Sequence, residues 1–139
     1  MSAFSLDTRL ANDTIDLGRL GICRVLLMQD ARYPWLILVP ERAGLSELIE
    51  LTPTDETSVW QTIRLASEAL KAVSTPLKLN VGALGNVVRQ LHIHIVARNE
   101  GDEAWPGPVW GKGTAVPYED TQRDSLIAAL KKALPELAQ

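Results

Sequence analysis

Residues 90–96 read Gln-Leu-His-Ile-His-Ile-Val and hold the only two histidines of this 139-residue chain. Apolar and polar side chains alternate along the stretch, and successive side chains of a β-strand point to opposite faces. We therefore predict a strand with one apolar face in the core and a second face that carries Gln90, His92 and His94. Imidazole is the side chain best suited to proton transfer and nucleophilic attack near neutral pH. The pattern indicates a chemical role for both histidines.

Length and composition predict one globular domain over residues 1–139. The net charge of −3 provides no polybasic surface, so direct binding to nucleic acid is not expected. The longest apolar runs are far shorter than a membrane span, and the first residues do not resemble a signal peptide. The single cysteine, Cys23, excludes an internal disulfide and is typical of a protein in the reducing cytoplasm.

Turn residues and apolar periodicity predict the order of the secondary structure. A helix is expected to begin after Thr54 as N-cap, with an apolar stripe of Val59, Ile63, Ala66, Leu70 and Val73. The other predicted elements are a short helix at 7–12, strands at 14–20, 22–29, 35–39, 77–81 and 88–98, a Pro/Gly-rich loop at 99–118 and a helix at 119–134. The strand at 35–39 is apolar on both faces and should lie centrally. Together these elements predict an α+β domain, an antiparallel meander with helices packed on one face.

Residues 80–96 as a whole, Asn-Val-Gly-Ala-Leu-Gly-Asn-Val-Val-Arg-Gln-Leu-His-Ile-His-Ile-Val, resemble the signature of the histidine triad (HIT) superfamily. That signature is His-φ-His-φ-His-φ-φ, with φ apolar, after a glycine-rich loop. The run at 35–40 is similar to a strand of the family, and the segments at 32–35 and 105–110 are similar to those of a bacterial branch. The resemblance implies a five-stranded antiparallel sheet with a long helix between strands 3 and 4, a core at about 14–100 and an added C-terminal helix.

The resemblance also implies an activity. HIT proteins act at the α-phosphate of nucleotides, and the middle histidine, here His92, forms a covalent nucleotidyl intermediate that splits one displacement into two steps. His94 would bind the phosphoryl oxygens or help to protonate the leaving group. A substrate-binding role is predicted for the loop and strand residues Asn80, Gly82, Gly85 and Asn86. No resident metal or cofactor is implied, although a divalent metal could accompany the substrate phosphates.

Three positions depart from the family pattern. Gln90 replaces the first histidine, whose role is to support the others, and its amide can still donate and accept hydrogen bonds. Asn86-Val87 replaces Gln-Ser/Thr in the phosphate loop and so lacks a hydroxyl. Ala43 stands where the family has a further histidine. We retain Gln90 beside His92 and His94 as a predicted catalytic residue.

Several alternatives remain open from the sequence. The histidines could be satisfied core residues, or they could ligate a metal with carboxylates or Cys23 completing the site. Arg98 shares the parity of His92 and could meet a substrate phosphate, although solvation at the surface is the more common role of such a residue. Trp105 and Trp110 could stack on a base, or they could seal the sheet or a dimer seam.

Two functions follow. The first is a nucleotide hydrolase or nucleotidyl transferase that acts on a dinucleoside polyphosphate or a nucleoside phosphoramidate through His92. The alternative is a nucleotide-binding or scaffold module with a degenerate triad and little catalysis. The resemblance further implies a homodimer, and we expect no association with membranes.

Overall fold

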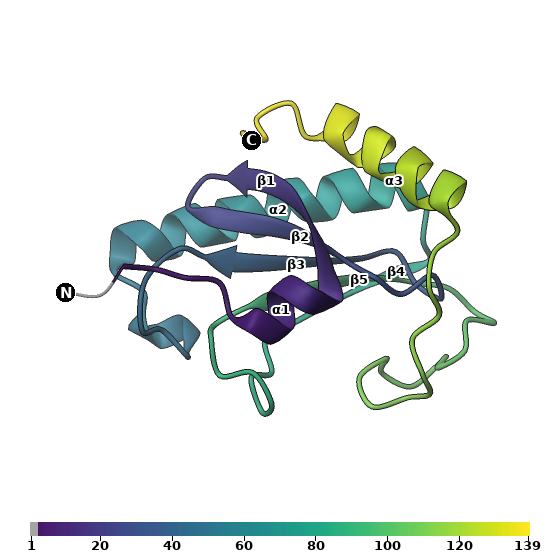
Figure 1. The fold of residues 1–139 in the computed structure, drawn as a ribbon, viewed down its shortest axis with the longest axis horizontal. Helices are drawn as coiled ribbons and strands as arrows, with labels where there is room; N and C mark the ends of the chain where they lie inside the picture. Colours follow the sequence, from purple (N-terminus) through teal and green to yellow (C-terminus); the bar gives the residue numbers. More distant parts are fainter. Residues whose placement is uncertain (1–2) are drawn as a thin grey trace.

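The computed structural model describes residues 3–139, which form a five-stranded antiparallel sheet and its covering helices (Figure 1). The elements follow the order α1 (Thr8–Asp13), β1 (Thr14–Leu20), β2 (Cys23–Met28), β3 (Trp35–Pro40), the 3₁₀ turn η1 (Leu48–Glu50), α2 (Pro53–Ser74), β4 (Lys78–Gly82), β5 (Ile93–Arg98) and α3 (Asp120–Ala133). The α+β class, the five strands and both long helices agree with the prediction.

The strand order in the sheet is β1-β2-β3-β5-β4. The first three strands form the predicted meander, but the last two do not continue it. The chain leaves β3, passes through α2 and returns at the sheet edge as β4, and β5 then pairs with β3 on one side and β4 on the other. The central strand of the five is β3, with β5 beside it, and every residue of both is buried. The histidine motif therefore ends in the interior of the sheet.

The long helix α2 covers one face of this sheet. Four residues of its predicted stripe, Val59, Ile63, Ala66 and Leu70, are buried, and the fifth, Val73, is partly buried against the same cluster. The N-cap, however, is Thr52 and not Thr54, because Thr52 accepts a hydrogen bond from the backbone N–H of Asp55 and Pro53 occupies the first helical position, where its missing N–H costs nothing. No helix among residues 3–139 is long and apolar enough to cross a membrane.

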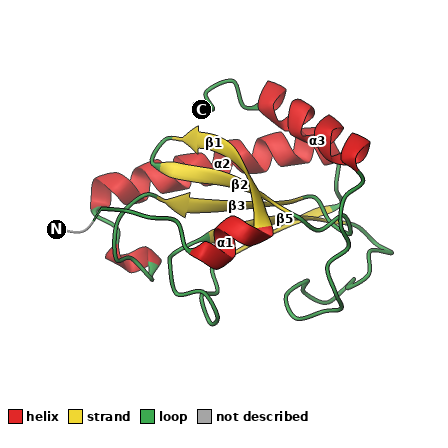
Figure 2. Cartoon of the chain, viewed as in Figure 1, coloured by secondary structure: helices red, strands yellow, loops and turns green. Residues whose placement is uncertain are grey.

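The prediction that the helices pack on one face of the sheet is wrong, because they lie on both faces (Figure 2). Apolar side chains of α2 and α3 pack with one face, in a cluster that includes Leu36, Leu38 and Ile95. On the opposite face, Leu10 of α1 packs with Ile37 of β3, together with the N-terminal segment and part of the loop at 99–118. This second, thinner layer leaves room for a cavity.

The last strand is shorter than predicted. Residues 88–92 lie outside the sheet, and β5 begins at Ile93. The edge strand β4 ends at Gly82, opposite His94, and the pairing with β3 stops at Leu38, although β3 itself continues to Pro40. The alternation nevertheless persists, since Leu91, Ile93 and Ile95 all enter the core under α2. The backbone N–H of Leu91 is satisfied by the carbonyl of Leu45 instead. The histidine face is thus preserved across the start of the strand.

Candidate active site

His92 and His94 lie side by side on the face of the sheet opposite α2. Their ring centroids are 4.8 Å apart, and each side chain is largely enclosed, with 7% of its surface exposed. His94 lies within β5 and His92 immediately precedes it. The predicted pairing of the two imidazoles on one face is therefore correct.

The two rings have different hydrogen-bond partners. Nδ1 of His92 lies 2.7 Å from the backbone carbonyl oxygen of Gln90. A carbonyl oxygen can only accept, so Nδ1 of His92 carries the proton and Nε2 keeps a free lone pair. Nδ1 of His94 instead accepts a hydrogen bond from the indole N–H of Trp35, at 3.1 Å, so the proton of neutral His94 is on Nε2. One histidine offers a lone pair and the other an N–H.

His94 is held in its neutral form. Burial and, to a smaller extent, the neighbouring His92 together lower its pKa to about 3. Desolvation disfavours the charged imidazolium, and Trp35 supplies no negative charge to offset that effect. His94 is therefore a neutral hydrogen-bond donor at physiological pH.

Both histidines open on a cavity of about 410 Å³. Its walls come from α1, β2, β3, the loop before β5 and the loop at 99–118, and most of the lining is apolar. Of the predicted substrate-binding residues, Gly85 and Asn86 line this cavity, whereas Asn80, Gly82 and Arg98 do not. Gly85 has φ of +83°, a conformation that residues with a Cβ rarely adopt, and so it allows the tight turn of this loop.

Gln90 has a different location from the one predicted. Its side-chain amide accepts a hydrogen bond from the backbone N–H of Asp7 and donates one to the carbonyl of Ser5, both at 2.9 Å. The side chain therefore holds the N-terminal segment and does not line the cavity. Only its backbone carbonyl contacts His92. Asp7 in turn caps α1, which contributes Arg9 and Leu10 to the cavity wall.

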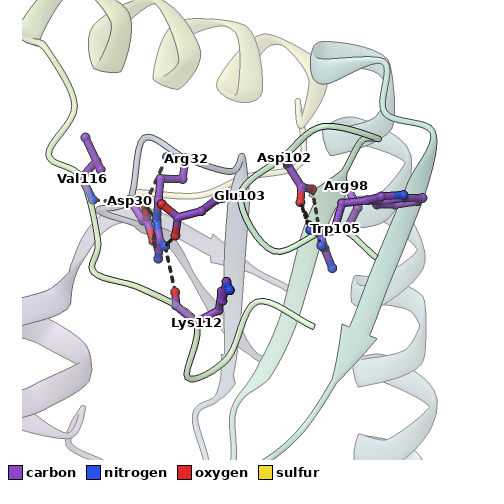
Figure 3. Close-up of polar contacts among 8 residues, drawn as sticks. All are labelled: Asp30, Arg32, Arg98, Asp102, Glu103, Trp105, Lys112 and Val116. Atoms are coloured by element: carbon purple, nitrogen blue, oxygen red, sulfur yellow. Dashed lines mark hydrogen bonds and ion pairs between the residues drawn. The ribbon is translucent and has the colours of Figure 1, made fainter. Parts of the chain in front are cut away.

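Arg98 is buried, with 2% exposure, so the expectation of a solvated surface role is wrong. Its guanidinium donates to both carboxylate oxygens of Asp102, to the side-chain oxygen of Asn80 and to the carbonyl of Gly107. It also lies 5.7 Å from the ring centroid of Trp105 (Figure 3). The donors of Arg98 and the side-chain oxygen of Asn80 are therefore used to anchor the loop at 99–118.

A second arginine, Arg32, holds the same loop from the cavity side (Figure 3). It pairs with Asp30 and Glu103 and donates to the carbonyl of Lys112 at 2.8 Å. Burial opposes ionisation of Asp30, but hydrogen bonds from Arg32 and from the backbone N–H of Val116 outweigh it, so the pKa of Asp30 is lowered. Sequence reasoning did not identify this pair; the short Asp-Ala-Arg spacing before β3 was its only signal.

Trp110 and Trp35 complete the wall around His94. The ring centroid of Trp110 is 5.3 Å from that of His94 and 6.4 Å from that of Trp35. Trp110 thus covers the sheet and lines the cavity at the same time, whereas Trp105 packs on Arg98 outside it. Neither contact tests stacking on a base.

The charges around the cavity are close to balanced, because Arg32 pairs with both Asp30 and Glu103. Three cationic side chains, Arg9, Arg32 and Lys112, and two carboxylates, Asp13 and Asp30, line it. Among residues 3–139, no group of three or more His, Cys, Asp or Glu side chains is placed to hold a metal ion. Cys23 is buried in the other core cluster, on the α2 side of the sheet.

Comparisons with known proteins agree with this fold. The family model of the HIT domain matches residues 11–101. A histidine triad protein from Sinorhizobium meliloti 1021 is 48% identical, with a TM-score of 0.92 over 94% of this chain and 97% of that one. A histidine triad protein from Marinobacter aquaeolei VT8 is 44% identical, with a TM-score of 0.94 over 99% of this chain and 100% of that one.

A more distant structure, a hypothetical histidine triad nucleotide-binding protein from Sulfolobus tokodaii strain 7, shares the fold alone. It is 15% identical, with a TM-score of 0.66 over 88% of this chain and 84% of that one. No curated protein matches the sequence. The site is a histidine pair at the floor of a cavity in an α+β domain, and the chain belongs to the histidine triad family.

Proposed function

We propose that this protein binds nucleotides and is a nucleotidyl hydrolase or transferase. Its substrate would be a dinucleoside polyphosphate or a nucleoside phosphoramidate, and its intermediate a covalent nucleotidyl-His92. The proposal rests on the complementary tautomers of the two imidazoles, because His92 presents a lone pair on Nε2 whereas His94 presents an N–H there. Membership of a family whose members act at the α-phosphate of nucleotides supports it.

In the first step, the Nε2 lone pair of His92 attacks the α-phosphorus and forms a nitrogen–phosphorus bond. The bond from phosphorus to the leaving group breaks, and its electron pair departs with that group. A phosphate leaves as an anion, whereas an amine takes a proton from solvent. The Nε2–H of His94 donates to a non-bridging phosphoryl oxygen; a neutral imidazole whose pKa is about 3 is suited to this role.

In the second step, water attacks the phosphorus and releases the mononucleotide. The nitrogen–phosphorus bond breaks, its electron pair returns to His92 and the proton of the water passes to solvent. A second phosphate in place of water makes the same reaction a transfer. The loop with Gly85 and Asn86 lies at the cavity wall, where backbone N–H groups can approach the phosphate.

Mass spectrometry after mixing with diadenosine polyphosphates or adenosine phosphoramidate, with and without Mg²⁺, tests this proposal. We expect mononucleotide product and an added nucleotidyl mass on the peptide that contains His92. The adduct should be acid-labile and base-stable, as a phosphoamide is. His92→Ala should abolish the adduct and lower turnover by at least about a thousandfold.

The matched control is Gln122→Ala, an exposed change on α3 at a residue that does not line the cavity, which should retain both signals. Turnover in His92→Ala equal to that of the parent would refute catalysis by His92. Nucleotide binding with neither adduct nor product in the parent would favour the alternative, a binding module with a degenerate triad.

A homodimer in the cytoplasm belongs to the same proposal. The edge strand β4 supports it, because its outer side pairs with no other strand among residues 3–139 and Val81 on it is 47% exposed. Sedimentation equilibrium should show a species of twice 15.3 kDa. A single species at 15.3 kDa at high concentration would exclude the dimer.

A further inference from the structure

The partner of His94 comes from a neighbouring strand. Trp35 opens β3, which pairs with β5 so that Ile37 lies opposite His94 and Trp35 lies two residues further along the same face. Its indole N–H reaches Nδ1 of His94 at 3.1 Å, with the two ring centroids 5.7 Å apart. Trp35 is 5% exposed, so water has little access to this hydrogen bond.

The chemical nature of this partner matters. A hydroxyl, an amide or another imidazole can donate or accept, and so would leave the tautomer of His94 undetermined. A carbonyl would force the proton onto Nδ1, as the carbonyl of Gln90 does for His92. An indole N–H can only donate, so Nδ1 of His94 must accept and its proton must reside on Nε2.

No other described side chain is placed to do the same. The amide of Gln90, at the position of the missing histidine, is engaged with Ser5 and Asp7. The indole nitrogen of Trp110, the other aromatic neighbour of His94, is buried and makes no hydrogen bond. Among the described residues, the tautomer of His94 therefore depends on one hydrogen bond.

We propose that Trp35 is the positioning residue of this site: its indole N–H holds His94 as the Nε2–H tautomer. Trp35 thereby performs the orienting role of the triad histidine that this chain lacks. The assignment of the tautomer concerns the ligand-free protein. Its catalytic consequence rests on the proposed function, because a phosphoryl oxygen would lose its donor whenever the proton of His94 moved to Nδ1.

Nitrogen-15 NMR of the histidine rings tests the tautomer directly. In the parent protein at pH 7, we expect His94 as the Nε2–H form and His92 as the Nδ1–H form. Trp35→Phe keeps an aromatic ring but removes the donor, and should give His94 a mixture of both tautomers. Trp110→Phe is the matched control, since it changes the other aromatic neighbour of His94 without removing a hydrogen bond, and should leave the tautomer of His94 unchanged.

The kinetic readout is kcat with a dinucleoside polyphosphate. Removing a whole transition-state donor costs roughly a hundredfold or more, so a donor present only part of the time should lower kcat about tenfold in Trp35→Phe. KM should change less than kcat, because the contact matters most as charge develops on the phosphoryl oxygen.

Two results would overturn the proposal. One is an Nδ1–H tautomer of His94 in the parent protein, which needs no variant and so does not depend on whether Trp35→Phe folds. The other is a folded Trp35→Phe protein with the tautomer and kcat of the parent. If the parent forms no nucleotidyl adduct, the proposed function fails, while the NMR measurement still decides the role of Trp35.

Discussion

The side chains of β5 alternate between two interiors that are stabilised in different ways. Ile93, Ile95 and Ala97 enter the layer beneath α2, where they pack in a large cluster of apolar side chains. His94 and Arg98 enter the opposite layer, where each is enclosed by hydrogen-bond partners or aromatic rings. The first interior depends on apolar volume, whereas the second combines apolar packing, to which Val96 contributes, with matched donors and acceptors. One strand can therefore contribute to both the core and the site, and substitutions on its two faces should have different consequences.

The largest effect is expected for Arg98→Met, on the site face. The change leaves Asp102 without its partner in a nearly closed environment, and breaking a buried ion pair costs about 3–5 kcal/mol. Urea unfolding should show this loss of stability. Arg64→Met is the control, because Arg64 forms an exposed pair with Glu68 on α2, and it should cost less than about 0.5 kcal/mol. Equal losses of unfolding free energy in Arg98→Met and Arg64→Met would contradict the view that the buried ion pair stabilises the fold more than the exposed one.

On the other face, Ile95→Ala should cost about 3 kcal/mol, because it removes a fully buried side chain and leaves a cavity under α2. Val81→Ala is a direct control, since Val81 pairs with Ile95 across the β4–β5 ladder but is half-exposed, and it should cost less than about 1 kcal/mol. Well below its unfolding temperature, Ile95→Ala should keep the His94 tautomer of the parent. A changed tautomer would show that the two interiors are coupled.

The two faces also differ in how far the sequence predicts them. Apolar periodicity located the strands near 14–20 and 35–39 and the stripe of α2, because burial against a flat sheet or a helix imposes a repeat that a single sequence shows. The same alternation overextends the strand at 88–92, because side-chain alternation can persist where the backbone bonds elsewhere, as the N–H of Leu91 does to the carbonyl of Leu45.

The site face was predicted only in part. The histidine pair is local in sequence and was found, as was the nearby loop with Gly85. The roles of Gln90, Arg98 and Trp35 depend on partners 59 to 85 residues away or on how the loop at 99–118 folds back, and no periodicity encodes such contacts. The sequence predicts Thr54 as the N-cap because it directly precedes the acidic first turn, and only the observed hydrogen bond identifies Thr52 instead.

The site face should also make stability depend on pH. His94 has a pKa near 6.5 when unfolded and about 3 when folded, so the unfolded state binds more protons between these values. Stability is then complete above pH 6.5 and decreases as the pH falls, by at most about 1.4 kcal/mol per pH unit. Between pH 6.5 and pH 5 the free energy of unfolding should fall by at most about 2 kcal/mol. Asp30 and Asp102, whose pKa values are lowered, stay ionised in this range.

Urea unfolding of the parent and of His94→Gln at the two pH values isolates this contribution. The variant has no imidazole at position 94, so it should lose less stability than the parent between pH 6.5 and pH 5. The same loss in both proteins would place the titrating group elsewhere.

The smallest effect concerns Gln90, which belongs to the site by sequence but to the N-terminal segment by contact. Gln90→Ala removes two partly exposed hydrogen bonds, to Ser5 and Asp7, and each such bond contributes about 1 kcal/mol or less. Hydrogen exchange should therefore become faster at residues 5–10 while the amides of β3 and β5 keep their protection. The carbonyl that orients His92 is part of the backbone, so the Nδ1–H tautomer of His92 should persist in Gln90→Ala. Loss of that tautomer with unchanged exchange at residues 5–10 would return Gln90 to the catalytic role that the family motif implies, because it would mean that the amide, and not the backbone, governs the imidazole.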